Sequence, residues 1–388
     1  MMRRLCLKAG LAGMAAIATG CASSLGGARA PSQAGVLATL TLANRYWQAN
    51  NTPAKWAFWD VAAYHTGNME AYFLTRDESW RRYSSDWAEH NNWSSASSPL
   101  KAEWKYSYGE TAQHVLFGDW QICFQTYIDL YQLETVKDPR KIARALEVMQ
   151  HQISTPNNDY WWWADGLYMV MPVMTKLYKV TGDVRYLDKL HEYFLFADKL
   201  MFDQEAGLYY RDAKYVYPKH KSGNGGKDFW ARGDGWVFAG LAKVLADLPQ
   251  SHASYALLLQ RFKQMAAALK PLQQADGYWT RSLLDPAQAP GPESSGTAFF
   301  TYAYLWGMNH GHLARAEYEA VALRGWRFLS TVALQADGKL GYVQPIGERA
   351  IAGQVVNQES TASFGVGAFL LAATELHRYL GKQDGPLR

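Results

Sequence analysis

A pair of amphipathic helical segments recurs along this 388-residue chain, and no other feature restricts its fold as much. Apolar residues at three- and four-residue spacing predict a helix in each segment, and turns with Asp-Pro or Gly-Asp join the paired helices. Similar loops, FDQEAGLYYRD, QQADGYWTRSL and QADGKLGYVQP, follow the pairs at intervals of roughly 60 to 70 residues. The predicted pairs span residues 121–154, 169–203, 235–274 and 296–335, and a last helix spans 366–380.

A helical hairpin of this length cannot bury its apolar face alone, so neighbouring hairpins must stack. About six such units fit in the chain, and strand-like alternation is scarce. We therefore predict an all-α fold in which six hairpins close into a ring. The Trp- and Gly-rich loops would gather at one mouth of that ring and form a pocket. No Pro/Ser-rich linker interrupts residues 31–388, so we predict a single domain there.

Residues 1–30 have the composition of an export signal. Arg3 and Arg4 precede a Gly/Ala-rich apolar stretch, and this pair resembles a twin-arginine signal. Cleavage before Cys21 would leave a lipid-anchored cysteine, whereas an A-x-A pattern fits cleavage after Ala30. We therefore expect a periplasmic protein, or one anchored in the outer membrane through Cys21.

Charge and cysteine content exclude several classes of function. The chain has 39 Lys and Arg against 35 Asp and Glu, and the excess lies in the export signal, so we predict no nucleic-acid partner. Beyond the signal, no segment has the ~18 uninterrupted apolar residues of a membrane span, and Cys123 is the only cysteine. The sequence has no H-E-x-x-H, C-x-x-C, P-loop or G-x-S-x-G motif, so we expect no metal and no cofactor.

Two aromatic segments each carry an aspartate close to an amphipathic helix. Asp119 lies in FGDWQ and Asp165 in YWWWADGLYM. Either aspartate could simply cap a helix, which is the plainer interpretation for Asp119. The four consecutive aromatic residues before Asp165 cannot all enter a core from one turn, so part of this stack should face a cavity. A carboxyl group set against indole rings is desolvated, its pKa rises, and it can act as a general acid.

A third segment, FWARGDGW at 229–236, places a cation and an acid among glycines. Arg232 offers a planar fork suited to a carboxylate, although an ion pair with Asp234 could merely pin the turn. The histidines are scattered along the sequence, and His114, near Asp119, is the one we expect to have a role beyond structure.

The order of these motifs resembles glycoside hydrolase family 105, the unsaturated rhamnogalacturonyl hydrolases, and more distantly family 88, the unsaturated glucuronyl hydrolases. The similarity is carried by WWADGLYMVMPVMTKLYKVTGDVRYLD followed by FWARGDGWVFAGLAKVL, and runs from about Asp119 to Leu370. It implies an (α/α)6 barrel, no metal and a site of two aspartates. By this resemblance the acid/base aspartate falls on Asp165, the second catalytic aspartate on Asp119, and an R-G-N-G-W motif on residues 232–236.

Two residues depart from the family pattern, and both bear on which substrate is bound. Asp234 stands where the motif has Asn, and Arg211 stands where many members carry His in the loop GLYYRD. We expect Arg232, with Arg211, to bind an acidic part of the substrate, because a guanidinium fork matches a carboxylate. The predicted substrate-binding residues are His114, Trp163, Arg211, Trp230, Arg232, Asp234 and Trp236. Among them, the tryptophans would stack on sugar faces.

The resemblance implies an enzyme that removes a 4,5-unsaturated uronic acid from the non-reducing end of acidic, lyase-generated oligosaccharides such as those from pectin. Protonation at carbon 4 of this enol ether creates an oxocarbenium-like centre at carbon 5. Water adds there, and the hemiketal opens and releases the neighbouring sugar. One carboxyl group that gives a proton and then takes one from water suffices. Two alternatives stay open: a non-catalytic carbohydrate-binding helical repeat, and a conventional inverting glycosidase or a lyase on the same barrel.

Overall fold

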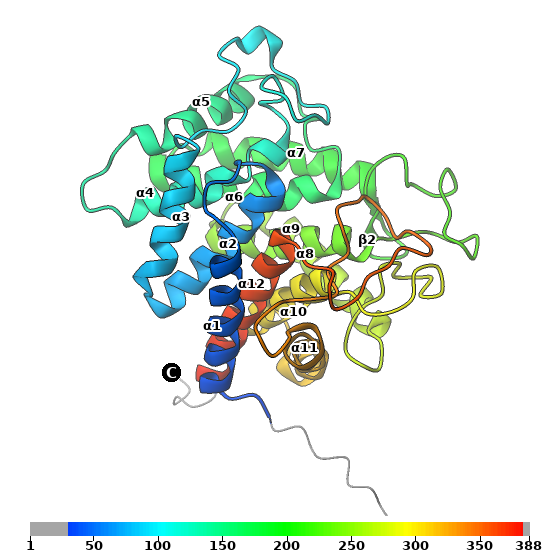
Figure 1. Ribbon diagram of the computed structural model, residues 1–388. Coiled ribbons are helices and arrows are strands. Elements are labelled where there is room, and N and C mark those ends of the chain that lie inside the picture. Colours follow the sequence, from blue (N-terminus) through cyan, green and yellow to red (C-terminus); the bar gives the residue numbers. More distant parts are fainter. Residues whose placement is uncertain (1–29, 383–388) are drawn as a thin grey trace, which may run out of the picture. The chain divides into compact units, whose positions relative to one another are not determined.

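Six helices form a closed inner ring and six others pack around it in residues 30–382, the part of the chain that the computed structural model describes (Figure 1). Each inner helix contacts the next, and the last contacts the first. The inner helices are α2 (Trp59–Thr75), α4 (Cys123–Leu133), α6 (Ala164–Thr181), α8 (Ala231–Asp247), α10 (Ser294–Asn309) and α12 (Ser363–Gly381). The outer helices are α1 (Gln33–Asn50), α3 (Glu78–His90), α5 (Arg140–Ser154), α7 (Arg185–Met201), α9 (Ser254–Leu269) and α11 (Arg315–Phe328). The predicted all-α (α/α)6 barrel is confirmed.

The inner and outer helices differ in how much of their surface is buried. The inner helices α10 and α12 are buried on almost every side, because neighbours surround them within the ring. The outer helix α5 buries a single stripe that includes Ile142, Val148 and Met149. A helix that is apolar all round is stable only inside such a bundle, whereas a helix with one apolar stripe suits the outer layer.

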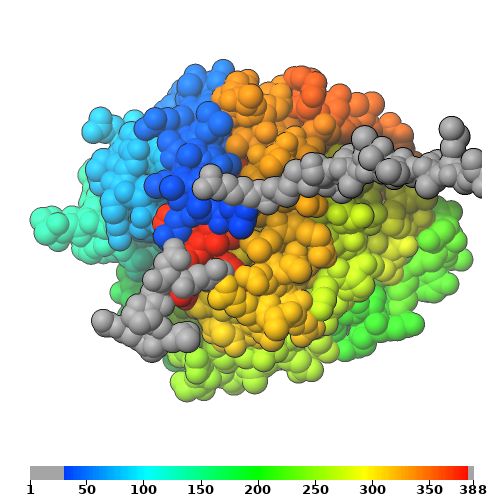
Figure 2. Space-filling model, turned by 90° about the horizontal axis from the view of Figure 1, so that it is seen from below, coloured from blue at the N-terminus to red at the C-terminus, as the bar shows by residue number. Residues whose placement is uncertain are grey.

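The sixth helical pair is made of the first and the last helix of the described chain. Five pairs, from α2–α3 to α10–α11, follow one another along the sequence, but α12 pairs with α1. Figure 2 shows the blue surface of α1 beside the red surface of α12. The sequence analysis predicted four of these pairs and α12, and it assigned no helix in residues 33–90.

The inner helices run in one direction, so their N-terminal ends meet at one mouth of the barrel. One cavity is lined by residues from their N-terminal ends and a second by residues from their C-terminal ends. The loops before the inner helices hold the remaining short elements. These are the 3-10 turns η1 (Lys101–Glu103), η2 (Gly118–Trp120) and η3 (Lys270–Leu272), the π-helical turn η4 (Leu329–Ala333), and the antiparallel strands β1 (Phe202–Asp203) and β2 (Leu208–Tyr209).

The residues of the predicted export signal, Arg3, Arg4 and Cys21 among them, lie outside the described residues, so export and lipidation stay predictions. Contacts group the described residues from Ser32 onward into one compact unit. Within residues 30–382, none of the helices has the length and apolar character needed to cross a bilayer.

The ring closes where α2 and α12 pack backbone against backbone at two glycines. A Cβ atom on Gly67 would lie 2.2 Å from the carbonyl oxygen of Gly367. A Cβ atom on Gly367 would lie 2.4 Å from the carbonyl oxygen of Ala63. Backbone atoms inside two packed helices cannot move aside as the end of a flexible side chain can, so this contact requires glycine on both helices.

We expect Gly67→Ala and Gly367→Ala each to lower the free energy of unfolding by about 1–3 kcal/mol, as overpacking does in a dense core. Denaturant unfolding would measure this change. The control is Gly35→Ala on the exposed face of α1. Its new Cβ atom would meet only the Ser32 hydroxyl, at 3.2 Å, and this exposed side chain can adjust. Because alanine favours helix, the change should be close to neutral or stabilising. A Gly367→Ala protein as stable as the unchanged chain would contradict the close packing of α2 on α12.

Candidate active site

A cavity of about 400 Å³ opens at the mouth formed by the N-terminal ends of the inner helices. Its size is typical of a site for a small molecule. The aromatic lining residues are Trp56, Phe58, Trp59, Tyr108, Trp162 and Trp163. The charged lining residues are Asp60, Glu110, Asp119, Asp165, Arg211, Lys214 and Glu348. The cavity therefore combines flat apolar walls with five carboxyl groups and two cations.

The two predicted catalytic aspartates line this cavity together, and neither is the N-cap of a helix. Asp165 lies in the first turn of α6, whose N-cap is Trp163, and Asp119 lies in η2, one turn before α4. Their side chains are buried, with relative exposures of 5% for Asp119 and 7% for Asp165. Asp119 Oδ1 and Asp165 Oδ2 have no hydrogen-bond partner within residues 30–382. These oxygens are therefore buried acceptors beside the cavity that no group in the described part of the chain satisfies.

Burial raises the pKa of both carboxyl groups above the usual value for aspartate. For Asp119 the rise is large, because the nearby Asp165 adds to the effect of burial while Arg211 opposes it. For Asp165, burial raises the pKa, and the guanidinium groups of Arg211 and Arg232 offset part of that rise. The pair can therefore keep a proton at a pH where exposed aspartates have lost theirs.

Arg211 is the cation nearest to this pair of aspartates. Its Nε lies 3.6 Å from Asp165 Oδ2, and its Nη1 lies 2.6 Å from Asp212 Oδ2 and 3.3 Å from Glu348 Oε2. Its guanidinium carbon lies 5.8 Å from the centre of the Trp162 ring. Arg211 thus links the loop before α8 to Glu348 in the loop before α12.

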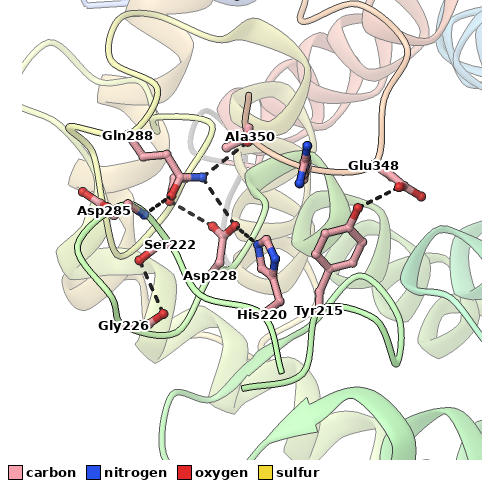
Figure 3. A network of polar contacts seen from close by, with 12 residues as sticks. Tyr215, His220, Ser222, Gly226, Asp228, Asp285, Gln288, Glu348 and Ala350 are labelled. Atoms are coloured by element: carbon pink, nitrogen blue, oxygen red, sulfur yellow. Dashed lines mark hydrogen bonds and ion pairs between the residues drawn. The ribbon is translucent and has the colours of Figure 1, made fainter. Parts of the chain in front are cut away.

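Polar contacts tie these two loops together around the cavity. Tyr215 donates a hydrogen bond to Glu348 at 2.7 Å, and Lys214 pairs with Glu348 at 2.9 Å. Farther from the cavity, His220 Nε2 lies 2.8 Å from Asp228 Oδ2. Figure 3 shows the contact between Tyr215 and Glu348 beside a second group of contacts around Asp228. In that group, Gln288 from the loop before α10 contacts Asp228 and the carbonyl oxygen of Ala350. The loop that carries Glu348 is therefore held in place over the site.

The structure differs from the sequence prediction for Arg232 and Trp230, which do not line the cavity. The Arg232 side chain is 1% exposed, and its Nη1 and Nη2 donate hydrogen bonds of 2.7 and 2.9 Å to the carbonyl oxygens of Gln344 and Pro345. Trp230 donates from Nε1 to the side chain of Gln344 at 2.8 Å. Because α8 begins at Ala231, these side chains bond to the neighbouring loop and do not line the cavity. They position the loop that carries Glu348.

Asp234, Trp236 and His114 also lie outside the cavity lining. Asp234 Oδ1 accepts a 2.8 Å hydrogen bond from the backbone N–H of Tyr209, so it anchors the loop that leads to Arg211. Trp236 is fully buried, and its ring contacts that of Trp59 edge to face. His114 Nδ1 lies 2.9 Å from the hydroxyl of Thr111. The ring of His114 packs against Gly109, whose sequence neighbours Tyr108 and Glu110 line the cavity.

The sequence analysis missed Asp60, which lies in the first turn of α2 and lines the cavity. Its Oδ1 has no hydrogen-bond partner within residues 30–382, and burial raises its pKa. A signal was present, because WAFWD at 56–60 repeats the pattern of WWWAD at 161–165: aromatic residues followed by an aspartate in the first turn of an inner helix. Glu110, Lys214 and Glu348 lie in loops and have no such signal. Among residues 30–382, no group of three or more His, Cys, Asp or Glu side chains could hold a metal ion.

Comparison with known proteins assigns this architecture to a family. The profile of glycosyl hydrolase family 88 matches residues 37–380. The chain belongs to glycosyl hydrolase family 88. The resemblance inferred from the sequence motifs is therefore confirmed at the level of the family.

Two curated relatives of this family 88 chain carry the name unsaturated 3S-rhamnoglycuronyl hydrolase. The protein from Alteromonas sp. (strain LOR) is 38% identical over 216 residues, which cover 56% of this chain and 51% of that protein. The protein from Formosa agariphila is 37% identical over 220 residues, which cover 56% of this chain and 57% of that protein. The chain thus spans about half the length of the curated relatives it matches.

Solved structures resemble the family 88 chain over nearly its whole length. A protein described as a polysaccharide lyase is 62% identical, with a TM-score of 0.87, and the match covers 92% of this chain and 99% of that one. A family 88 protein from Bacteroides vulgatus is 54% identical, with a TM-score of 0.88, and the match covers 90% and 100% of the two chains. A possible family 105 member from Salmonella enterica, 20% identical with a TM-score of 0.69, covers 90% and 95% and shares the fold.

The raised pKa of Asp119 predicts that this carboxyl group lowers stability at neutral pH. A carboxyl whose pKa is higher in the folded state than in the unfolded state favours folding only at low pH, and this contribution is lost as the pH rises through the folded-state pKa. We therefore expect Asp119→Asn to raise the free energy of unfolding at neutral pH, with the gain shrinking towards about pH 4, where the unfolded carboxyl also becomes protonated. Denaturant unfolding at several pH values would measure this. A gain that does not depend on pH would contradict the burial argument.

Proposed function

We propose that this chain is a glycoside hydrolase that removes a 4,5-unsaturated uronic acid from the non-reducing end of acidic oligosaccharides. The observation that carries the proposal is the pair of buried aspartates with raised pKa values in an aromatic cavity that also contains Arg211. Family membership and the names of the two curated relatives support it. Those names also favour oligosaccharides in which the uronic acid is joined to rhamnose.

Each group around the cavity has a task in this reaction. Trp162 and Trp163 offer flat faces on which a sugar ring can stack, while Arg211 and Lys214 can receive its carboxylate. Protonated Asp165 delivers a proton to carbon 4 and afterwards accepts one from the attacking water. The carboxyl dipole of the neighbouring Asp119 stabilises the positive charge that develops at carbon 5, and this role does not require Asp119 to be ionised.

The conjugated double bond of the substrate gives a direct test. Incubation with lyase-generated oligosaccharides should lower the ultraviolet absorbance of the double bond, and Asp165→Asn should reduce this rate by about 10²–10⁴-fold, as expected for a lost general acid/base. The control variant is Arg185→Gln, which removes an exposed ion pair with Asp183 on the outer layer. Unchanged absorbance would favour a carbohydrate-binding protein, and cleavage without loss of absorbance would favour an ordinary glycosidase.

A second candidate function is a lyase that creates the same double bond. The name of the 62% identical structure supports it, as does Arg211, because a cation on the uronate carboxylate acidifies the hydrogen at carbon 5 that β-elimination removes. The same assay separates the two reactions. With intact uronate-containing oligosaccharides, a lyase raises the absorbance, whereas the proposed hydrolase leaves intact substrates unchanged and lowers the absorbance of unsaturated ones.

We also infer export across the inner membrane, supported by Arg3-Arg4 and the apolar stretch that follows them. Two mature forms are consistent with the sequence, a protein lipidated at Cys21 and one that begins at Pro31. Mass spectrometry of the protein from its host should find one of these N-termini in the envelope fraction. An intact Met1 in the cytoplasmic fraction would contradict export.

A further inference from the structure

The guanidinium group of Arg211 donates a hydrogen bond through Nη1, whereas its Nε makes no hydrogen bond within residues 30–382. Its backbone carbonyl accepts a 2.8 Å hydrogen bond from Ala164, the residue before Asp165. Nη1 donates to Asp212 at 2.6 Å, and Asp212 is itself fixed by the backbone N–H of Lys214 at 2.7 Å. Asp212 therefore holds the Nη1 side of the guanidinium group, independently of the contact that Arg211 makes with Asp165.

The contact between Arg211 and Asp165 is an ion pair without a hydrogen bond. The distance from Nε to Oδ2 is 3.6 Å, which is longer than a hydrogen bond. Neither atom has another hydrogen-bond partner within residues 30–382, although both are buried. A donor and an acceptor left unsatisfied at a cavity wall are costly, and a ligand that bonds to either recovers that cost.

We propose that Arg211 exchanges partners when substrate binds: it is the counter-ion of the Asp165 carboxylate in the free protein and of the uronate carboxylate in the complex, and Asp165 then takes up one proton from solvent. One carboxylate replaces another on the same guanidinium group, and the proton neutralises the aspartate that lost its counter-ion. This inference rests on the proposed function, since it requires a uronate in the cavity.

The other charges around Asp165 cannot make this exchange. The charged groups around Asp165 and its neighbours Asp119 and Arg211 are Asp60, Glu110, Asp119, Asp212, Lys214, Arg232 and Glu348. The acids only add negative charge. Arg232 is committed to two backbone carbonyl groups, and Lys214 pairs with Glu348 at the exposed rim. Arg211 is therefore the cation that can leave Asp165 for a substrate.

Under this exchange, protonation of Asp165 depends on which ligand is bound. The charge of Arg211 lowers the pKa of Asp165 in the free protein, against the opposite effect of burial. A uronate that neutralises Arg211 removes this effect and raises the pKa of Asp165, so the acid becomes protonated only when the correct ligand is present. A neutral sugar of the same shape stacks on the tryptophans and leaves Asp165 ionised. Arg211 would thus act as a specificity residue as well as a binding residue.

Calorimetry of ligand binding in buffers with different ionisation enthalpies tests the exchange without relying on turnover. Titration of the whole protein with glucuronic acid at a series of pH values should show uptake of up to about one proton per bound ligand at pH values between the pKa of Asp165 in the free protein and its higher pKa in the complex, and titration with glucose should show none. Arg211→Gln should weaken glucuronic acid binding by at least about tenfold and abolish most of the uptake, because Asp165 is already protonated. Arg185→Gln, the exposed control, should match the unchanged protein.

Two further variants identify the proton acceptor and guard against misfolding. Asp165→Asn should still bind glucuronic acid but without proton uptake, and Arg211→Lys, which keeps the charge, should retain part of both binding and uptake. Binding of glucuronic acid without uptake at any pH, or uptake that persists in Asp165→Asn, would overturn the exchange and leave the proposed function intact. If the unchanged protein neither bound glucuronic acid nor acted on unsaturated oligosaccharides, the proposed function itself would fail.

Discussion

The glycine contact between α2 and α12 closes the ring on which the rest of the structure depends. Because Gly67 and Gly367 let two backbones touch, the last inner helix returns to the first, and α1 completes the outer layer against α12. Closure brings the N-terminal ends of six helices, and the loops before them, to one mouth. A cavity with walls contributed by residues as distant as Trp56 and Glu348 exists only because the chain returns to its start.

Closure also explains why several carboxyl groups can be buried together at that mouth. Asp60 and Asp165 lie in the first turns of inner helices, where the helix dipole favours negative charge. Desolvation works in the opposite direction and raises their pKa values. The charge of Arg211 offsets part of this rise at Asp165. Burial, the helix terminus and this cation together set the pKa of Asp165 above the usual value for aspartate.

Much of the fold followed from helical periodicity. The segments that became α4 to α12 have apolar residues at clear helical spacing, whereas α3 is rich in polar residues and α1 has its partner at the other end of the chain. The aromatic context of Asp165 pointed to a cavity, and Asp165 and Asp119 do share one. Arg232 and Trp236 carried an equally strong motif, but both lie outside the cavity lining: Arg232 bonds to the loop at Gln344, and Trp236 is buried in the barrel core.

The sequence by itself determined the helices from α4 to α12, through the spacing of their apolar residues. It also determined the chemistry of the site, because carboxyl groups, indole rings and guanidinium groups cluster near the helix starts. Only the tertiary structure decided which of these groups face the cavity. Arg232 and Arg211 are indistinguishable as sequence letters, yet α8 starts in a position that points Arg232 at the Gln344 carbonyl, while the loop before it places Arg211 beside Asp165. The direction of a side chain depends on where its helix begins and on what packs against it. Those contacts come from distant segments, 46 residues away for Arg211 and Asp165 and 112 residues away for Arg232 and Gln344.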